Sequence, residues 1–311
     1  MKRIFSLALV LALLTSTLFA DEVRVSFEND VFFKTDSWYT HGTLISYTFV
    51  VDPTEHWLID DTVTYRKASF GQYMYTPADI TVPELIEEDR PYAGLIYGEL
   101  TEYMESENRM QSISILLGVV GPYSFADETQ IFVHEKITDS SYPKGWDNQL
   151  DDEPVVNVGY ADRHRLLDSK WWDWIGRYGI SVGNLNTHAS IGTTFKFGWN
   201  VPPNYDIVSL EPVPRDYEVQ MNGYPVLGKA VLIGFVDLEG AAVAHNILLD
   251  GNTFSDSHSV DKEPLVGGLV AGITLGITDF EITYSMHWRT KEFEGQEHTP
   301  KYGGLSLSYR F

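Results

Sequence analysis

The chain has 311 residues, no cysteine and a formal net charge of −22 at pH 7, with 44 acidic residues against 22 Lys and Arg. The absence of cysteine excludes disulfide bonds and thiolate chemistry. The acidic balance argues against a nucleic-acid partner, because affinity for nucleic acid depends on Lys and Arg side chains that neutralise phosphates. Aromatic residues make up 14% of the chain, which is typical of proteins with aromatic girdles at two membrane interfaces.

The first 20 residues predict a secretory signal peptide. Lys2 and Arg3 precede an apolar run over 4–14, and a short segment follows up to Ala20, after which cleavage is expected. No later apolar run reaches the roughly 20 residues that a transmembrane helix needs. Residues 21–311 are therefore expected to form a single domain that crosses a membrane with strands.

Apolar and polar residues alternate along many segments of this domain. From Phe280 to Trp288 the even positions are apolar and the odd positions are polar, and the stretch from Leu305 to Phe311 alternates in the same way. Strands with one face in lipid and one face in water have this period of two, so the even positions of 280–288 should face lipid. The sequence predicts an all-β fold, a transmembrane antiparallel β-barrel of about 12 strands; the alternative is a soluble secreted β-protein. The predicted strands are 22–33, 40–51, 63–75, 92–105, 110–121, 153–163, 174–184, 190–199, 227–238, 264–276, 279–289 and 302–311.

An even number of strands brings both chain ends to the periplasmic side, so the loops after odd-numbered strands face outward. The motif-like polar stretches lie almost entirely in or beside these loops, which predicts that ionisable residues from distant parts of the chain meet at one rim. The Pro-rich segment 200–226 follows an even-numbered strand, where a short periplasmic turn is expected, and it is too long for such a turn. The predicted outward loops are 34–39, 76–91, 122–152, 185–189, 239–263 and 290–301.

The longest outward loop, 122–152, predicts a short helix. Gly121 and Pro122 break the strand, and Ser124 could cap the turn that follows. On such a helix Gln130 and His134 are four residues apart and share a face. His134 is the best candidate for a general base, because only imidazole has an unperturbed pKa near neutrality. The alternative is a solvated or hydrogen-bonded loop histidine without a catalytic role.

Asn29 and Asp30 could bind a cation where the first strand ends. Strand alternation would place Asp30 toward the lumen and Asn29 on the lipid side. Calcium takes carboxylate, amide and backbone oxygens in irregular geometry, so Asp30 could form a Ca²⁺ site with a loop carboxylate such as Glu153. The alternative is an Asx-turn that ends the strand.

The motifs around these residues resemble those of the lipid A 3′-O-deacylase family of outer-membrane enzymes. Three of the matching stretches are Glu28-Asn29-Asp30, Tyr39-Thr40-His41-Gly42 and Asp89-Arg90-Pro91-Tyr92-Ala93-Gly94. The others are 75–77, 118–122, 130–134, 143–150, 246–254, 256–262 and 289–293. Together they extend over nearly the whole chain after the signal peptide.

The resemblance implies a twelve-stranded barrel with a Ca²⁺-dependent active site that hydrolyses the 3′-linked acyl esters of lipid A at the outer leaflet. By position, His134 would be the general base, with Gln130 beside it. Asn29 and Asp30 would bind the ion, with Thr40 next to them in the catalytic site. His41 stands where the family usually has Asn.

Three further residues are predicted to contact the substrate: His41, and Arg90 and Lys144, which could bind the lipid A phosphates. The expected partner is lipid A, or lipopolysaccharide, in the outer leaflet, and the protein is expected to be a membrane-embedded monomer in the bacterial outer membrane. Two other functions are left open by the sequence. One is an outer-membrane phospholipase with similar ester chemistry, and the other is a non-enzymatic porin or adhesin barrel.

Overall fold

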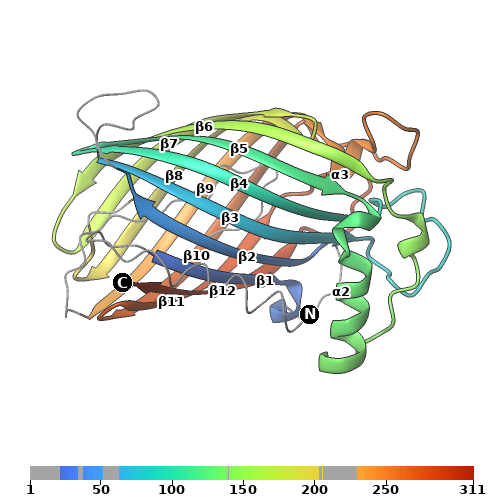
Figure 1. Cartoon of the computed structure of the whole chain (residues 1–311), viewed down its shortest axis with the longest axis horizontal. Helices are drawn as coiled ribbons and strands as arrows, with labels where there is room; N and C mark the ends of the chain where they lie inside the picture. Colours follow the sequence, from blue (N-terminus) through green and yellow to red (C-terminus); the bar gives the residue numbers. More distant parts are fainter. Residues whose placement is uncertain (1–21, 34–37, 52–62, 139, 203–204, 206–229) are drawn as a thin grey trace.

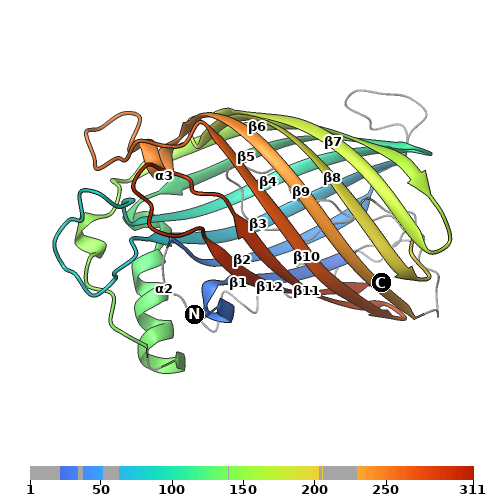
Figure 2. The same cartoon turned by 180° about the vertical axis from the view of Figure 1, so that it is seen from behind.

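The computed structural model describes residues 22–33, 38–51, 63–138, 140–202, 205 and 230–311. Twelve antiparallel strands form a closed barrel in which each strand pairs with the next and β12 pairs with β1 (Figures 1 and 2). The strands are β1 (Glu22–Asn29), β2 (Trp38–Val50), β3 (Val63–Thr76), β4 (Ala93–Ser106), β5 (Arg109–Val120), β6 (Glu153–Asp168), β7 (Trp172–Gly183), β8 (Asn186–Trp199), β9 (Val231–Asn246), β10 (Leu265–Ile277), β11 (Phe280–Arg289) and β12 (Lys301–Arg310).

Short helical elements lie between the strands. The two that Figure 1 labels are α2 and α3, both at the same end of the barrel, which we call the loop end. Within the described residues no helix is long and apolar enough to cross a membrane. The helical elements are η1 (Asp30–Phe33), η2 (Pro122–Ser124), α2 (Ala126–Val133), η3 (His134–Thr138), η4 (Trp146–Asn148) and α3 (Ile247–Asp250).

The predicted fold class is confirmed, but several strand boundaries were wrong. The first strand ends at Asn29 instead of residue 33, and the ninth covers Val231–Asn246 instead of 227–238. Strand β9 therefore includes the first part of the predicted loop 239–263, where glycine and alanine hide the alternation. Strand β8 likewise begins at Asn186, inside the predicted loop 185–189. The predicted signal peptide and most of the segment 200–226 lie outside the described residues.

The face assignment of β11 is confirmed. Phe280 and Ile282 are exposed on the outside of the barrel, whereas Thr283, Ser285 and His287 are buried in its interior. The outside row is partly covered near the loop end, where the ring of Phe33 lies 6.2 Å from that of Trp288 and the ring of Phe32 lies 5.8 Å from that of Tyr284. Alternation along the other strands defines the same two faces, which we call the lipid-side face and the lumen face.

The loop end of the lumen is filled by a cluster of buried apolar and tyrosine side chains, which we call the mouth cluster. Most of its members come from the lumen face of the strands, and Leu150, Leu185, Ile247 and Leu248 come from the connections above them. The ring of Tyr39 packs against that of Tyr302 at 4.4 Å, and the hydroxyls of Tyr73 and Tyr97 are 2.7 Å apart. The complete cluster is Tyr39, Leu44, Tyr73, Tyr75, Ala93, Leu95, Tyr97, Leu116, Val120, Leu150, Val155, Leu185, Ile247, Leu248 and Tyr302.

Deeper in the lumen, charged side chains pair with one another. The guanidinium of Arg177 donates to both carboxylate oxygens of Asp237, at 2.6 and 2.9 Å, and to Glu239 at 3.0 Å. The Arg177 and Asp237 side chains are 3% and 0% exposed. A buried charge that loses its partner is costly, so this bidentate pair should contribute strongly to the stability of the barrel.

Asp237→Ala should lower the free energy of unfolding of the barrel by about 3–5 kcal/mol. The buried positive charge of Arg177 would then be paired with Glu239 alone of these two carboxylates. The measurement is the temperature at which the folded band converts to the unfolded band in heat-modifiability gels. Asp261→Ala, at an exposed loop carboxylate, is the matched control. A transition temperature equal to that of the parent would contradict the proposed contribution of this pair.

Candidate active site

A β-bulge at the loop end of β2 turns two neighbouring side chains toward the lipid side. The register of β2 against β3 shifts between Tyr39 and His41. Tyr39 belongs to the mouth cluster, and a Cβ on Gly42 would meet the hydroxyl of Tyr39 and the ring of Tyr73, so both positions face the lumen. Because a bulge adds one residue to the strand, Thr40 and His41 both lie on the opposite, lipid-side face.

Asn29 lies beside this bulge, on the same face. It pairs with His41 across β1 and β2, and it continues the lipid-side row of Val25 and Phe27. Its side-chain oxygen accepts the backbone N–H of Val31 at 2.8 Å, which is the predicted alternative of an Asx-turn that ends the strand. The ring of His41 packs edge-on against Phe27, with ring centroids 5.0 Å apart.

Asp30 is not part of strand β1, so the alternation from which its lumen-facing orientation was predicted does not extend to it. It is the first residue of η1 and is 3% exposed. The η1 turn folds back over the lipid-side face of β12, where the ring of Phe32 occupies the space above Gly303. The Asx-turn at Asn29 therefore directs the chain out of the wall at the point where Asp30 stands.

The predicted loop helix is present as α2, and it packs against the outside of the barrel. Gly94 is on the lipid-side face of β4, because its neighbours Ala93 and Leu95 belong to the mouth cluster. A Cβ on Gly94 would collide with Ser124 and Ala126 of the loop. In Figures 1 and 2, α2 lies at the loop end and runs across the barrel axis.

The start of α2 differs from its prediction. Ser124 does not cap the helix; it belongs to η2, and Phe125 is the N-cap with no side-chain hydrogen bond to the backbone. The backbone carbonyl of Ser124 accepts a hydrogen bond from the Gln72 side chain of β3 at 2.7 Å. This contact ties the beginning of the loop 122–152 to the barrel wall.

Gln130 and His134 lie four residues apart on the buried face of the loop helix, as their spacing predicted. The Gln130 side-chain oxygen accepts the indole N–H of Trp146 at 2.7 Å. His134 is 7% exposed, and its Nδ1 lies 2.6 Å from the backbone carbonyl of Ser141. A carbonyl can only accept, so Nδ1 carries the proton and the lone pair of the neutral ring is on Nε2. Trp146 and Ser141 were missed as partners, although Trp146 lies within the motif 143–150.

Five of the predicted residues thus lie on the outside of the barrel at the loop end. The lipid-side face of β1 and β2 is bordered by η1, which packs on β12, and by α2, which packs on β3 and β4. We call this region the outer-wall site. Its residues are Asn29, Thr40, His41, Gln130 and His134, and Asp30 stands at its η1 border. Thr40 also pairs with Thr76, with their hydroxyl oxygens 2.8 Å apart.

Glu153 does not join this site, so its predicted pairing with Asp30 is corrected. It begins β6, five strands away from β1, on the lumen face. Its carboxylate accepts hydrogen bonds from the Thr253 backbone N–H at 2.8 Å and from the side chains of Asn184 at 2.9 Å and Asn252 at 3.3 Å. Glu153 therefore connects two loops at the rim, the one after β7 that contains Asn184 and the one after α3 that contains Asn252 and Thr253.

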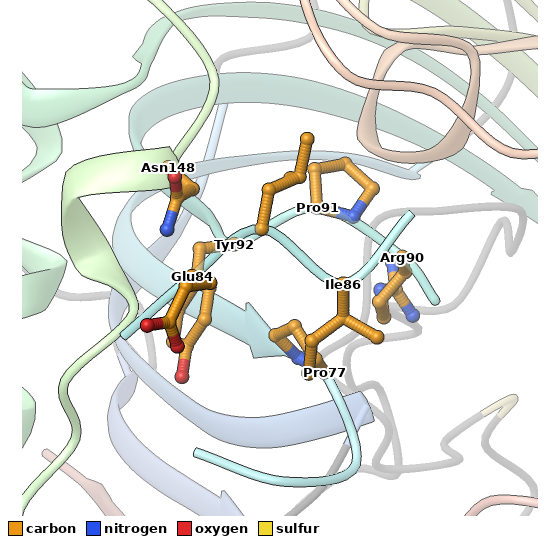
Figure 3. A pocket seen from close by; sticks show the side chains of 8 residues that line it. Pro77, Glu84, Ile86, Arg90, Pro91, Tyr92 and Asn148 are labelled. Atoms are coloured by element: carbon orange, nitrogen blue, oxygen red, sulfur yellow. The ribbon is translucent and has the colours of Figure 1, made fainter. Parts of the chain in front are cut away.

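Arg90 is also used inside the protein, which contradicts its predicted contact with a substrate phosphate. Its side chain is 1% exposed, donates to Glu292 at 3.3 Å and lies over the ring of Tyr75, 4.2 Å from the ring centroid. Arg90 lines a small pocket between the loop 76–91 and η4, together with Tyr92 and Asn148 (Figure 3). Lys144 is exposed on the loop that precedes Trp146, so its contact with a phosphate stays a prediction.

The comparisons with known proteins identify the family of this barrel. The model of the family described as outer membrane protein LpxR matches residues 5–311. The solved structure of LpxR from Salmonella typhimurium superimposes with a TM-score of 0.78 at 17% identity, over 93% of this chain and 100% of that one. The β domain of the Bordetella autotransporter BrkA gives a TM-score of 0.44 at 9% identity, over 94% of this chain and 98% of that one. No curated protein matches the chain by sequence. The chain therefore belongs to the outer membrane protein LpxR family and is a protein of the bacterial outer membrane.

Proposed function

We propose that this protein is an outer-membrane ester hydrolase that removes the 3′-linked acyl chains of lipid A. The observation that carries the proposal is the position of His134, which is buried at the end of α2, the helix that packs on the lipid-side face of the barrel through Ala126. A membrane lipid can reach this face by lateral diffusion. Membership of the LpxR family supports the same substrate class.

His134 is the proposed general base. Its Nδ1–H bond to the Ser141 carbonyl orients the ring, so that Nε2 can take a proton from a water molecule that attacks the ester carbonyl. A bond forms between the water oxygen and the acyl carbon, and the bond from that carbon to the sugar oxygen breaks. The sugar oxygen takes the proton back from His134, and the fatty acid leaves.

The other residues of the outer-wall site position the substrate and the base. Gln130 is held by Trp146 and lies one helical turn before His134, so it can orient the base or the attacking water. The acyl chains lie along the exposed apolar side chains of the wall, such as Phe27 and Ile45. His41 borders the same surface. Lys144, on the same loop as His134, contacts a phosphate of the head group.

Calcium is the cation that the donor set of this site favours. Asp30 supplies a carboxylate, and Asn29 and Thr40 supply neutral oxygens on the adjoining face, which is the oxygen chemistry that Ca²⁺ prefers. Among the described residues there is no group of three or more His, Asp or Glu that could hold a metal. The ion would therefore depend largely on amide, hydroxyl, backbone or water oxygens besides the Asp30 carboxylate. When bound, it supplies positive charge that stabilises a developing oxyanion.

Mass spectrometry of lipid A tests the proposed function. Lipid A from cells that express the parent protein should lack the 3′-linked acyl chains, whereas lipid A from cells that express His134→Ala should keep them. Production of lysophospholipid with intact lipid A would instead identify the protein as a phospholipase. Unchanged lipids of both classes, with folded protein in the outer membrane, would exclude either hydrolase.

Gly94→Ala should lower lipid A deacylation by roughly 10²-fold, because a misplacement of about 1 Å at a catalytic group can cost that much. The added methyl group would collide with Ser124 and Ala126 and move α2 away from the wall. Gly98→Ala is a matched control on the same strand face, since its Cβ would have only an ordinary contact at 3.8 Å. Equal rates for the two variants, measured with purified protein, would contradict the packing role of Gly94.

A further inference from the structure

The loop that carries His134 exposes an unusual number of large apolar side chains. Five lie between Tyr123 and Tyr142, with exposed fractions of 48–68%. The other described loops at this end expose such side chains singly or in a pair, as at Phe254 in the loop after α3. The five residues, which we call the loop apolar surface, are Tyr123, Phe125, Phe132, Ile137 and Tyr142.

This surface points away from the protein. Phe132 lies two residues after Gln130, which places it on the opposite side of α2, and Phe125 is exposed at the N-cap of the helix. Ala126 and Gln130 lie on the other side, where they are buried against Gly94 and Trp146. Packing against the barrel wall therefore accounts for one side of the helix only.

The loop apolar surface is continuous with the lipid-side face of the barrel. The α2 helix is attached to that face through Ala126 and runs across the barrel axis, so it lies along the membrane plane (Figures 1 and 2). A helix in this orientation with aromatic residues on its free side is typical of interfacial segments, whose apolar face enters the boundary between head groups and acyl chains.

We propose that the loop apolar surface inserts into the outer leaflet and fixes the depth of His134 relative to the bilayer. The occupant of the surface is the lipid bilayer itself. Tyrosine suits this boundary because its ring meets acyl chains and its hydroxyl meets hydrated groups. Phenylalanine is typical of the apolar face that interfacial helices bury in the membrane. This inference deepens the proposed function, on which it rests for the role of His134 but not for the insertion.

The test uses spin labels on single cysteines, which the absence of native cysteine makes possible. Full-length protein with Phe132→Cys or Ile137→Cys is reconstituted into phosphatidylcholine–phosphatidylglycerol vesicles, and collisions of the label with oxygen and with a water-soluble nickel chelate are measured. Leu117→Cys, on the exposed lipid-side face, is the membrane reference, and Phe254→Cys is the water reference.

Labels at 132 and 137 should collide more often with oxygen than with the nickel chelate, as is expected of the label at 117 in the membrane. Nickel-favoured collisions equal to those at 254 would overturn the proposal, and so would spin–spin broadening that shows a second copy of the chain covering the surface. The insertion and the proposed function can fail separately. Oxygen-favoured labels on a protein that does not deacylate lipid A would keep the insertion and reject the proposed function.

A kinetic experiment tests whether insertion of the loop apolar surface matters for the reaction on membrane-bound lipid A. Phe132→Ser should raise the KM for lipid A in vesicles several-fold, with kcat little changed, and it should behave as the parent does when the substrate is dispersed in detergent micelles. An equal KM for variant and parent on vesicles would overturn the claim that insertion fixes the depth of the site.

Discussion

His134→Ala and His134→Asn should each reduce lipid A deacylation by roughly 10²–10⁴-fold, the usual contribution of a positioned proton-transfer group. The two variants separate positioning from chemistry. Asparagine can still donate a hydrogen bond to the Ser141 carbonyl that now accepts from Nδ1, but it has no basic nitrogen. If both variants lose activity to a similar extent, the missing function is that of a base.

The measurement is release of fatty acid from lipid A by purified protein in detergent with Ca²⁺. Folding should survive, because His134 lies in the loop outside the barrel wall, and an unchanged heat-modifiable band checks this. His164→Ala, which replaces a histidine on the part of β6 away from the loop end, is the matched control. Deacylation by His134→Ala at a rate near that of the parent would remove the assignment of the base.

Asp30→Ala should abolish most of the activity, by about 10²-fold or more, because it removes the carboxylate of the proposed Ca²⁺ site. Asp30→Asn keeps the shape and one oxygen but loses the charge, so it should bind Ca²⁺ more weakly than the parent and regain part of its activity at high Ca²⁺. Binding is measured directly by luminescence of terbium, a substitute for Ca²⁺, which provides a readout that does not depend on activity.

Asp79→Ala is the control for this experiment, since Asp79 is an exposed loop carboxylate whose side chain accepts hydrogen bonds from Thr81. It should leave both terbium binding and activity unchanged. Full activity of the parent protein in excess chelator would reject the calcium hypothesis, and it would leave the assignment of His134 unaffected.

The barrel could be predicted because its strongest signal is local. Alternation along 280–288 separates the two faces of β11 without knowledge of any neighbour, and the structure reproduces that separation. The prediction failed where alternation is interrupted or weak. Glycine and alanine fill both faces of β9 near its end, and the turn at Asn29 ends β1 before the predicted residue 33.

The candidate site was predicted in part for the same reason. The spacing of Gln130 and His134 is a property of one helix, so sequence alone could place them on one face. Glu153 and Arg90 were assigned incorrectly because their environments depend on residues about 100 and 200 positions away, Thr253 and Glu292. No periodic pattern reports such a partner. Polar residues at a rim can bind each other as well as a ligand, and only the tertiary structure distinguishes the two cases.

The mouth cluster has a consequence for how cells tolerate this protein. Its tyrosine and aliphatic side chains occupy the lumen at the loop end, while the outer-wall site is on the other side of the same wall. A lipid substrate therefore needs no passage through the barrel, and the interior can be packed for stability alone. The proposed reaction therefore calls for no aqueous channel, which separates remodelling of the cell surface from permeability.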